Sequence, residues 1–115
     1  GGGQGGGGGV PRDVRLIAEA TQAQVEDMVR CIATWDSALA DRIRKADDLV
    51  DALNGQILQE LQAGMQEDST AVPADVALIM IAKNFERIGD HCVNVAEDVV
   101  FLMRGQIVRH EHEQK

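Results

Sequence analysis

The sequence contains few aromatic and few basic side chains. Aromatic residues make up 3% of its 115 residues, and 11 Lys and Arg stand against 19 Asp and Glu, which gives a formal net charge of -8. A nucleic-acid surface needs a basic patch for the phosphates and, for single strands, aromatic rings on which bases stack. The composition therefore argues against a nucleic-acid partner. An acidic surface instead attracts cations or basic proteins.

Long apolar runs and closely spaced cysteines are also missing. The chain has no run of about 18 apolar residues, so the sequence predicts no membrane span. Cys31 and Cys92 are far apart and do not form a Cys-x-x-Cys motif. We interpret them as reduced core thiols of a cytosolic protein, with a disulfide or metal ligation as the alternative.

Glycine is concentrated in the first nine residues, which are eight Gly and one Gln. Such a tract has no side chains to bury, and it predicts a disordered Gly-rich segment over 1–9. The remainder is long enough for one domain over 10–106, followed by a polar tail over 107–115. His110 and His112 stand among acidic residues in this tail. Without a helix to fix both rings, we expect a disordered tail, with weak metal chelation as the alternative.

Apolar residues recur at spacings of three and four, which is typical of helices with one buried face. The pattern predicts helices over about 12–35, 37–65 and 73–103, the last ending near Gly105, and it predicts no strand. The expected buried faces are Val14, Ile17, Thr21, Val25, Met28, Ile32 and Trp35; Leu39, Ile43, Ala46, Val50, Leu53, Ile57, Leu61 and Met65; and Val76, Ile79, Ala82, Phe85, Gly89, Cys92, Ala96, Val99 and Met103. Short connections between long helices predict an all-α fold, an up-down-up three-helix bundle.

Two acidic pairs lie beside these apolar faces. Asp47 and Asp51 in the second predicted helix, and Glu86 and Asp90 in the third, are each one turn apart. Like charges at this spacing repel by a few tenths of a kcal/mol, roughly, unless a cation neutralises them. Two antiparallel helices with such pairs can place four carboxylates around one space, an arrangement that suits hard cations. Spacing alone leaves two interpretations, a solvated acidic face and a cation site.

The sequence lacks the residue sets of an enzyme. Its serines, Ser37 and Ser69, have no histidine nearby in the chain. Di-iron helical bundles use a Glu-x-x-His motif, whereas Gly89 stands three residues after Glu86. We therefore predict a binding protein without catalytic activity.

The segment 85–97, FERIGDHCVNVAE, closely resembles the ERIGDHxxNIAE motif of the phosphate-uptake regulator family PhoU. The segment 99–105 is similar to the end of that family's repeat, and 47–51 is similar to its D-x-x-V-D element. The resemblance covers about residues 12–110. Members of the family usually carry two three-helix repeats, and this chain resembles the C-terminal one.

The resemblance implies a non-enzymatic regulator of phosphate uptake and of phosphate-starvation signalling, the Pho regulon. Such a protein is expected to be an adaptor between the ATPase of a phosphate ABC transporter and a sensor histidine kinase. It is expected to be cytoplasmic, peripheral to the inner membrane face, and a homodimer.

The resemblance also implies metal binding, because family members can hold metal ions on E/D-x-x-x-D motifs. Carried over to this sequence, the ligands are Asp47, Asp51, Glu86 and Asp90. Iron, zinc, manganese and magnesium are the candidate ions. One alternative is a metal-dependent enzyme or metal store built on the same carboxylates. Another is a purely structural helical oligomer.

Overall fold

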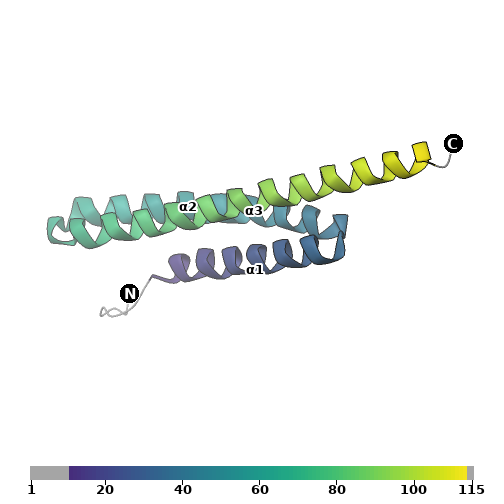
Figure 1. The fold of residues 1–115 in the computed structure, drawn as a ribbon. Helices are drawn as coiled ribbons and strands as arrows, with labels where there is room; N and C mark the ends of the chain where they lie inside the picture. The colour runs from purple at the N-terminus through teal and green to yellow at the C-terminus, as the bar shows by residue number, and fades with distance from the viewer. Residues whose placement is uncertain (1–10, 114–115) are drawn as a thin grey trace.

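The computed structural model describes residues 11–113, so the glycine tract predicted to be disordered lies outside the described residues. The helices are α1 (Arg12–Thr34), α2 (Ser37–Glu67) and α3 (Val72–Glu113), with a short 3₁₀ turn, η2 (Ser69–Ala71), before α3. Successive helices run antiparallel (Figure 1), and this part of the chain contains no strand. The structure confirms the all-α, up-down-up bundle. Over residues 11–113, no helix combines the length and the hydropathy that a membrane-spanning segment needs.

Local hydrogen bonds reverse the chain at both ends of α2. Trp35 follows α1 in the left-handed region, with φ 55°, and its N–H donates to the last turn of α1 at 2.8 Å. Asp36 is the N-cap of α2, since its side chain accepts from the Ala38 N–H at 2.9 Å. Asp68 accepts from the Thr70 N–H at 3.0 Å and so begins the η2 turn. These turns bring the three helices side by side.

The interior of the bundle consists of two apolar clusters with a polar layer between them. The first apolar cluster is Val14, Ile17, Val50, Leu53, Ile57 and Ala82. The second apolar cluster is Cys31, Leu39, Ala40, Ile43, Cys92 and Ala96. Between them, the inward faces carry Gln24 on α1, Asp47 on α2 and Gly89 on α3, which we call the polar layer. Each apolar cluster takes side chains from all three helices, so burial of apolar surface holds the helices together on both sides of this layer.

The buried face of α1 differs from the predicted one in its second half. There the buried residues are Gln24, Asp27 and Cys31, whereas Ile32 and Trp35 are 48% and 39% exposed. Apolar side chains had suggested a face shifted by one residue. The polar side chains are buried instead because α2 provides a carbonyl and a guanidinium as their partners.

The predicted faces of α2 and α3 are buried or partly buried except at Val76, which is 46% exposed. Val76 lies in the first turns of α3, next to the α2–α3 connection. In Figure 1 this end of the bundle extends past the start of α1, so α1 does not cover it.

The predicted end of the third helix near Gly105 is wrong, because α3 continues to Glu113 and is 42 residues long. Gly105 lies inside the helix, with nothing within 4 Å of the position of a Cβ. A glycine inside a helix costs only about 1 kcal/mol relative to alanine, which the surrounding turns can offset. The described part of the predicted disordered tail, 107–113, is therefore helical and projects beyond the other helices (Figure 1). Residues 114 and 115 lie outside the described residues.

Cys31 and Cys92 are free thiols in the second apolar cluster, as the sequence predicts. Burial raises the pKa of both thiols, and the charge of Asp36 near Cys31 and of Asp47 near Cys92 raises it further. A raised pKa keeps a thiol protonated, and a protonated thiol is a poor nucleophile and a poor metal ligand. Both cysteines are therefore packing residues.

Candidate metal centre

Three aspartates from two helices converge on one space. Asp47 and Asp51 extend from neighbouring turns of α2, and Asp90 extends from α3. One carboxylate oxygen of each lies within 4.8 Å of the other two. Oxygens that bind one Ca²⁺ lie about 2.3–2.6 Å from it, so oxygens within about 5 Å of each other can share an ion. We call these three residues the aspartate cluster.

Glu86, the fourth predicted ligand, lies at the edge of the aspartate cluster. Its carboxylate lies close enough to that of Asp51 to raise the pKa of Asp51. Its Oε2 accepts from Asn54 Nδ2 at 3.3 Å, and its Oε1 lies 3.7 Å from Lys83 Nζ. The structure thus brings all four predicted carboxylates together, but Glu86 has partners of its own.

Within the described residues, no cationic side chain pairs with a member of the aspartate cluster. Over residues 11–113, the contact of Lys83 with Glu86 is the only ion pair that involves any of the four carboxylates. Burial is the main cause that raises the pKa of Asp47 above its ordinary 3.8, and the charges of Asp51 and Asp90 raise it further, against a hydrogen bond from Gln24.

Asp51 is perturbed in the same direction. Burial, then the contact with Glu86 and the charge of Asp90, raise its pKa. Raised values mean that the ionised carboxylates are less stable here than in water, and a bound cation reverses that penalty. The electrostatics of the site therefore suit a cation.

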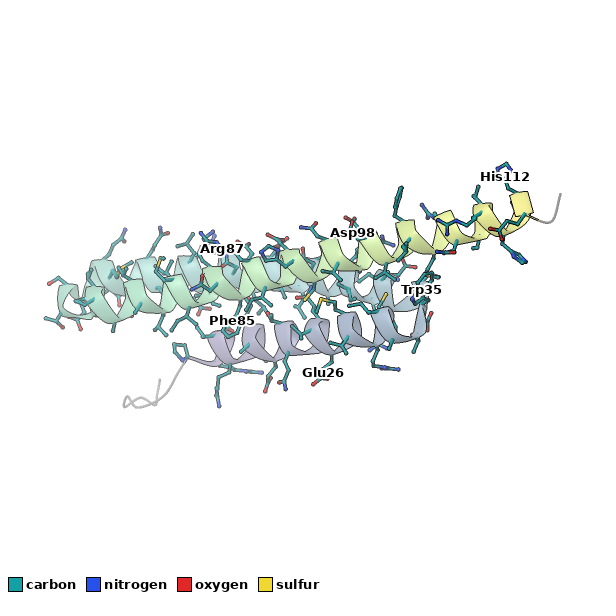
Figure 2. The ribbon with its side chains drawn as sticks, viewed as in Figure 1. Glu26, Trp35, Phe85, Arg87, Asp98 and His112 are labelled. Carbon is teal, nitrogen blue, oxygen red and sulfur yellow. The ribbon has the colours of Figure 1, made fainter. Side chains whose placement is uncertain are left out.

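Gly89 allows α1 and α2 to approach α3 closely at the polar layer. A Cβ on Gly89 would lie 2.8 Å from both Asp47 Oδ1 and Gln24 Oε1, closer than such atoms normally approach. Phe85 lies one turn earlier on the side of α3 that faces α1, whereas Arg87 points away from α1 (Figure 2). The sequence placed Gly89 on the buried face. Only the structure shows that a larger residue at this position would collide with Asp47 and Gln24.

Two buried amides support the site, and the sequence prediction missed both. Gln24 is 0% exposed and donates from Nε2 to Asp47 Oδ1 at 3.3 Å and to the Ile43 carbonyl at 3.2 Å. Asn54 is 7% exposed and donates to Glu86. Gln24 could have been found from the sequence, because it stands three residues after Thr21 and so lies on the same helix face.

The profile of the PhoU domain matches residues 14–99, a range that contains every residue of this site. The chain belongs to the PhoU domain family. The resemblance that the sequence shows over 85–97 is thereby confirmed. In this PhoU domain, the resembling segment supplies Glu86, Gly89 and Asp90 to the site.

Relatives of this PhoU domain include the phosphate-specific transport system accessory protein PhoU homolog of Pseudomonas aeruginosa, 37% identical over 98 residues. The PhoU homolog of Xylella fastidiosa strain 9a5c is 32% identical over 93 residues. The accessory protein PhoU of Escherichia coli K12 is 33% identical over 94 residues. The matches cover 85%, 81% and 82% of this chain, but 40%, 39% and 39% of the relatives. The chain thus spans about two fifths of the length of the curated relatives it matches.

Proposed function

We propose that this PhoU domain is a non-enzymatic accessory module of a phosphate-specific transport system and that it binds a hard cation at Asp47, Asp51, Glu86 and Asp90. The observation that carries the proposal is the convergence of three aspartates without cationic partners, within 4.8 Å, among residues 11–113. The names of the relatives, accessory proteins of phosphate-specific transport, support the first part.

The donor set consists of carboxylate oxygens, which suit magnesium and manganese best among the ions suggested by the sequence. Iron and zinc bind nitrogen and sulfur donors more often. A bound cation would neutralise the repulsion between α2 and α3. In this arrangement Gln24 orients Asp47 and Asn54 orients Glu86, so that the carboxylates are held for binding.

The proposed role in signalling is that of an adaptor between the ATPase of the transporter and a sensor histidine kinase, at the cytoplasmic face of the inner membrane, as a homodimer. Exposed apolar side chains in the C-terminal part of α3 support partner binding. Phe101, Leu102 and Ile107 are 78%, 51% and 57% exposed. Large apolar side chains exposed to water near the end of a helix can pack against a partner protein.

Metal content tests the cation site. We expect Mn²⁺ to bind the chelator-treated chain in calorimetry, and the double variant Asp47→Asn, Glu86→Gln to bind it at least about tenfold more weakly, since two charged ligands are lost. Asp41→Asn is the matched control, because Asp41 pairs with Arg44 on the exposed surface of α2. Equal metal content in the double variant and the wild type, by elemental analysis, would rule out this site.

Binding to purified partners tests the adaptor role. We expect the cytosolic domain of a phosphate-sensing kinase, and the transporter ATPase, to bind this chain or the full-length protein in calorimetry. Absence of binding by both forms at tens of micromolar would contradict the adaptor role and leave the cation site untouched. Turnover of phosphate esters or oxygen by the metal-loaded chain would favour the enzyme alternative instead.

A further inference from the structure

Gln24 carries a buried oxygen that has no hydrogen-bond partner. The residue is 0% exposed, and within the described part of the chain its Oε1 is the only buried side-chain oxygen or nitrogen without a partner. Leaving a buried acceptor unpaired destabilises the folded state, because the oxygen loses its hydrogen bonds to water and gains none in exchange. Such groups are rare in folded proteins, and each requires a physical reason.

The orientation of the Gln24 amide is fixed by its surroundings. Nε2 donates to the Ile43 carbonyl at 3.2 Å and to Asp47 Oδ1 at 3.3 Å. Turning the amide over would place Oε1 against these two acceptors and lose both hydrogen bonds. The carbonyl oxygen therefore stays on the other side of the amide, toward α3.

The Gln24 oxygen lies beside the aspartate cluster. Oε1 and Asp47 Oδ1 are each 2.8 Å from the position of a Cβ on Gly89, so both oxygens line the same space against the backbone of α3. Asp90, another member of the cluster, is the next residue of that helix. An unpaired oxygen and a carboxylate thus share one side of the proposed site.

We propose that Gln24 Oε1 is a further cation ligand, which makes the centre a site of three helices; this inference rests on the proposed cation site. Amide oxygens are good ligands for hard cations and, unlike a fifth carboxylate, add no negative charge to a site that already repels. The cation then compensates the unpaired oxygen. It also links α1 to α2 and α3, so that occupancy of the site stabilises the whole polar layer.

The experiment is Mn²⁺ binding by the full chain, followed by calorimetry at neutral pH with chelator-treated protein. Gln24→Met keeps the side-chain length and removes both amide atoms, and we expect binding to weaken by more than about tenfold, because a ligand oxygen is lost together with the hydrogen bond that orients Asp47. Gln24→Glu keeps one oxygen at the same position but sets the other against Asp47 and the Ile43 carbonyl, and we expect an affinity between those of the wild type and Gln24→Met. Circular dichroism checks that each variant is folded.

Asn54→Leu is the matched control. It removes an amide that donates to a site carboxylate but carries no buried unpaired oxygen. We expect Gln24→Met to weaken Mn²⁺ binding more than Asn54→Leu does. Equal losses in these two variants, or a folded Gln24→Glu that binds as weakly as Gln24→Met, would show that Gln24 acts through its N–H and would overturn the assignment.

Asp47→Asn tests the cation site separately from the role of Gln24. If it weakens Mn²⁺ binding and Gln24→Met leaves the affinity unchanged, the cation site stands and the role of Gln24 falls. If Asp47→Asn itself binds like the wild type, or the wild type does not bind Mn²⁺, both proposals fall together.

Discussion

Asp27 and Asp47 both extend from inward-facing positions, but the neighbours of their carboxylates differ. Asp27 is 9% exposed and lies 3.3 Å from Arg42 and 3.9 Å from Arg30. Asp47 is half-buried and has as close neighbours the amide of Gln24 and the other aspartates of the cluster. One carboxylate is compensated within the chain, whereas the other is compensated only by dipoles.

The difference distinguishes a carboxylate that stabilises the fold from carboxylates that are available to bind a ligand. A carboxylate paired with arginine has its electrostatic partner already, so the pair fixes α1 against α2 and offers little to a ligand. Carboxylates that repel one another raise the free energy of the folded state until a cation joins them. The same residue type thus contributes to folding at one level of the bundle and to recognition at another.

The largest expected effect concerns the glycine that makes the second region possible. Gly89→Ala places a Cβ 2.8 Å from two side-chain oxygens, one of which belongs to the fully buried Gln24. We expect a net loss of about 1–2 kcal/mol in the free energy of unfolding, because overpacking outweighs the gain in helix propensity. Cation affinity should fall as Asp47 is displaced. Urea unfolding and Mn²⁺ calorimetry measure the two effects.

Gly55→Ala is the control for this substitution, since nothing lies within 4 Å of a Cβ at that helical position. It should stabilise the chain by up to about 1 kcal/mol. If Gly89→Ala stabilises the chain as much as Gly55→Ala, the side chains of the polar layer move freely and the close packing inferred for it is wrong.

The next largest effect is that Asp27→Asn and Asp47→Asn should change the free energy of unfolding in opposite directions, in metal-free protein at neutral pH. Asp27→Asn should lower the free energy of unfolding by about 1 kcal/mol, since it removes the charge that pairs with Arg42, which is largely exposed. Asp47→Asn should raise it, because Asn still accepts the hydrogen bond from Gln24 while the repulsion disappears. Chemical unfolding measures both changes in free energy. If the two substitutions shift it in the same direction, the contrast between Asp27 and Asp47 is wrong.

The smallest effect is a pH dependence that follows from the raised pKa values of Asp47 and Asp51. Since their folded-state values lie above the ordinary 3.8, the folded state binds more protons than the unfolded state between the two values. Their contribution to stability is therefore fully present below 3.8 and is lost as the pH rises through the folded-state values.

The measurement is the difference between wild type and Asp47→Asn in metal-free protein, because other carboxylates titrate in both. On acidification from neutral pH, the wild type should gain more stability than the variant. Saturating Mn²⁺ should reverse this trend, since protons then compete with the cation for the same oxygens. A difference that does not vary with pH would show that Asp47 is not perturbed.

Much of the fold and the charged part of the site could be predicted from periodicity. A spacing of four residues puts Asp47 beside Asp51 and Glu86 beside Asp90 in any helix, and the short connections between long helices predict antiparallel neighbours. The end of α3 was missed because a glycine is compatible with both a helix end and a helix interior, and its small energetic cost does not distinguish them.

The sequence by itself determined the helices, the family and the four carboxylates, because these depend on local spacing and on a contiguous motif. Only the tertiary structure decided which of those carboxylates remain unpaired, and that Gln24, more than 60 positions away along the chain, lies against Gly89. The physical reason is that compensation of charge and satisfaction of a buried amide depend on atoms from other helices. Their positions follow from packing of the two apolar clusters.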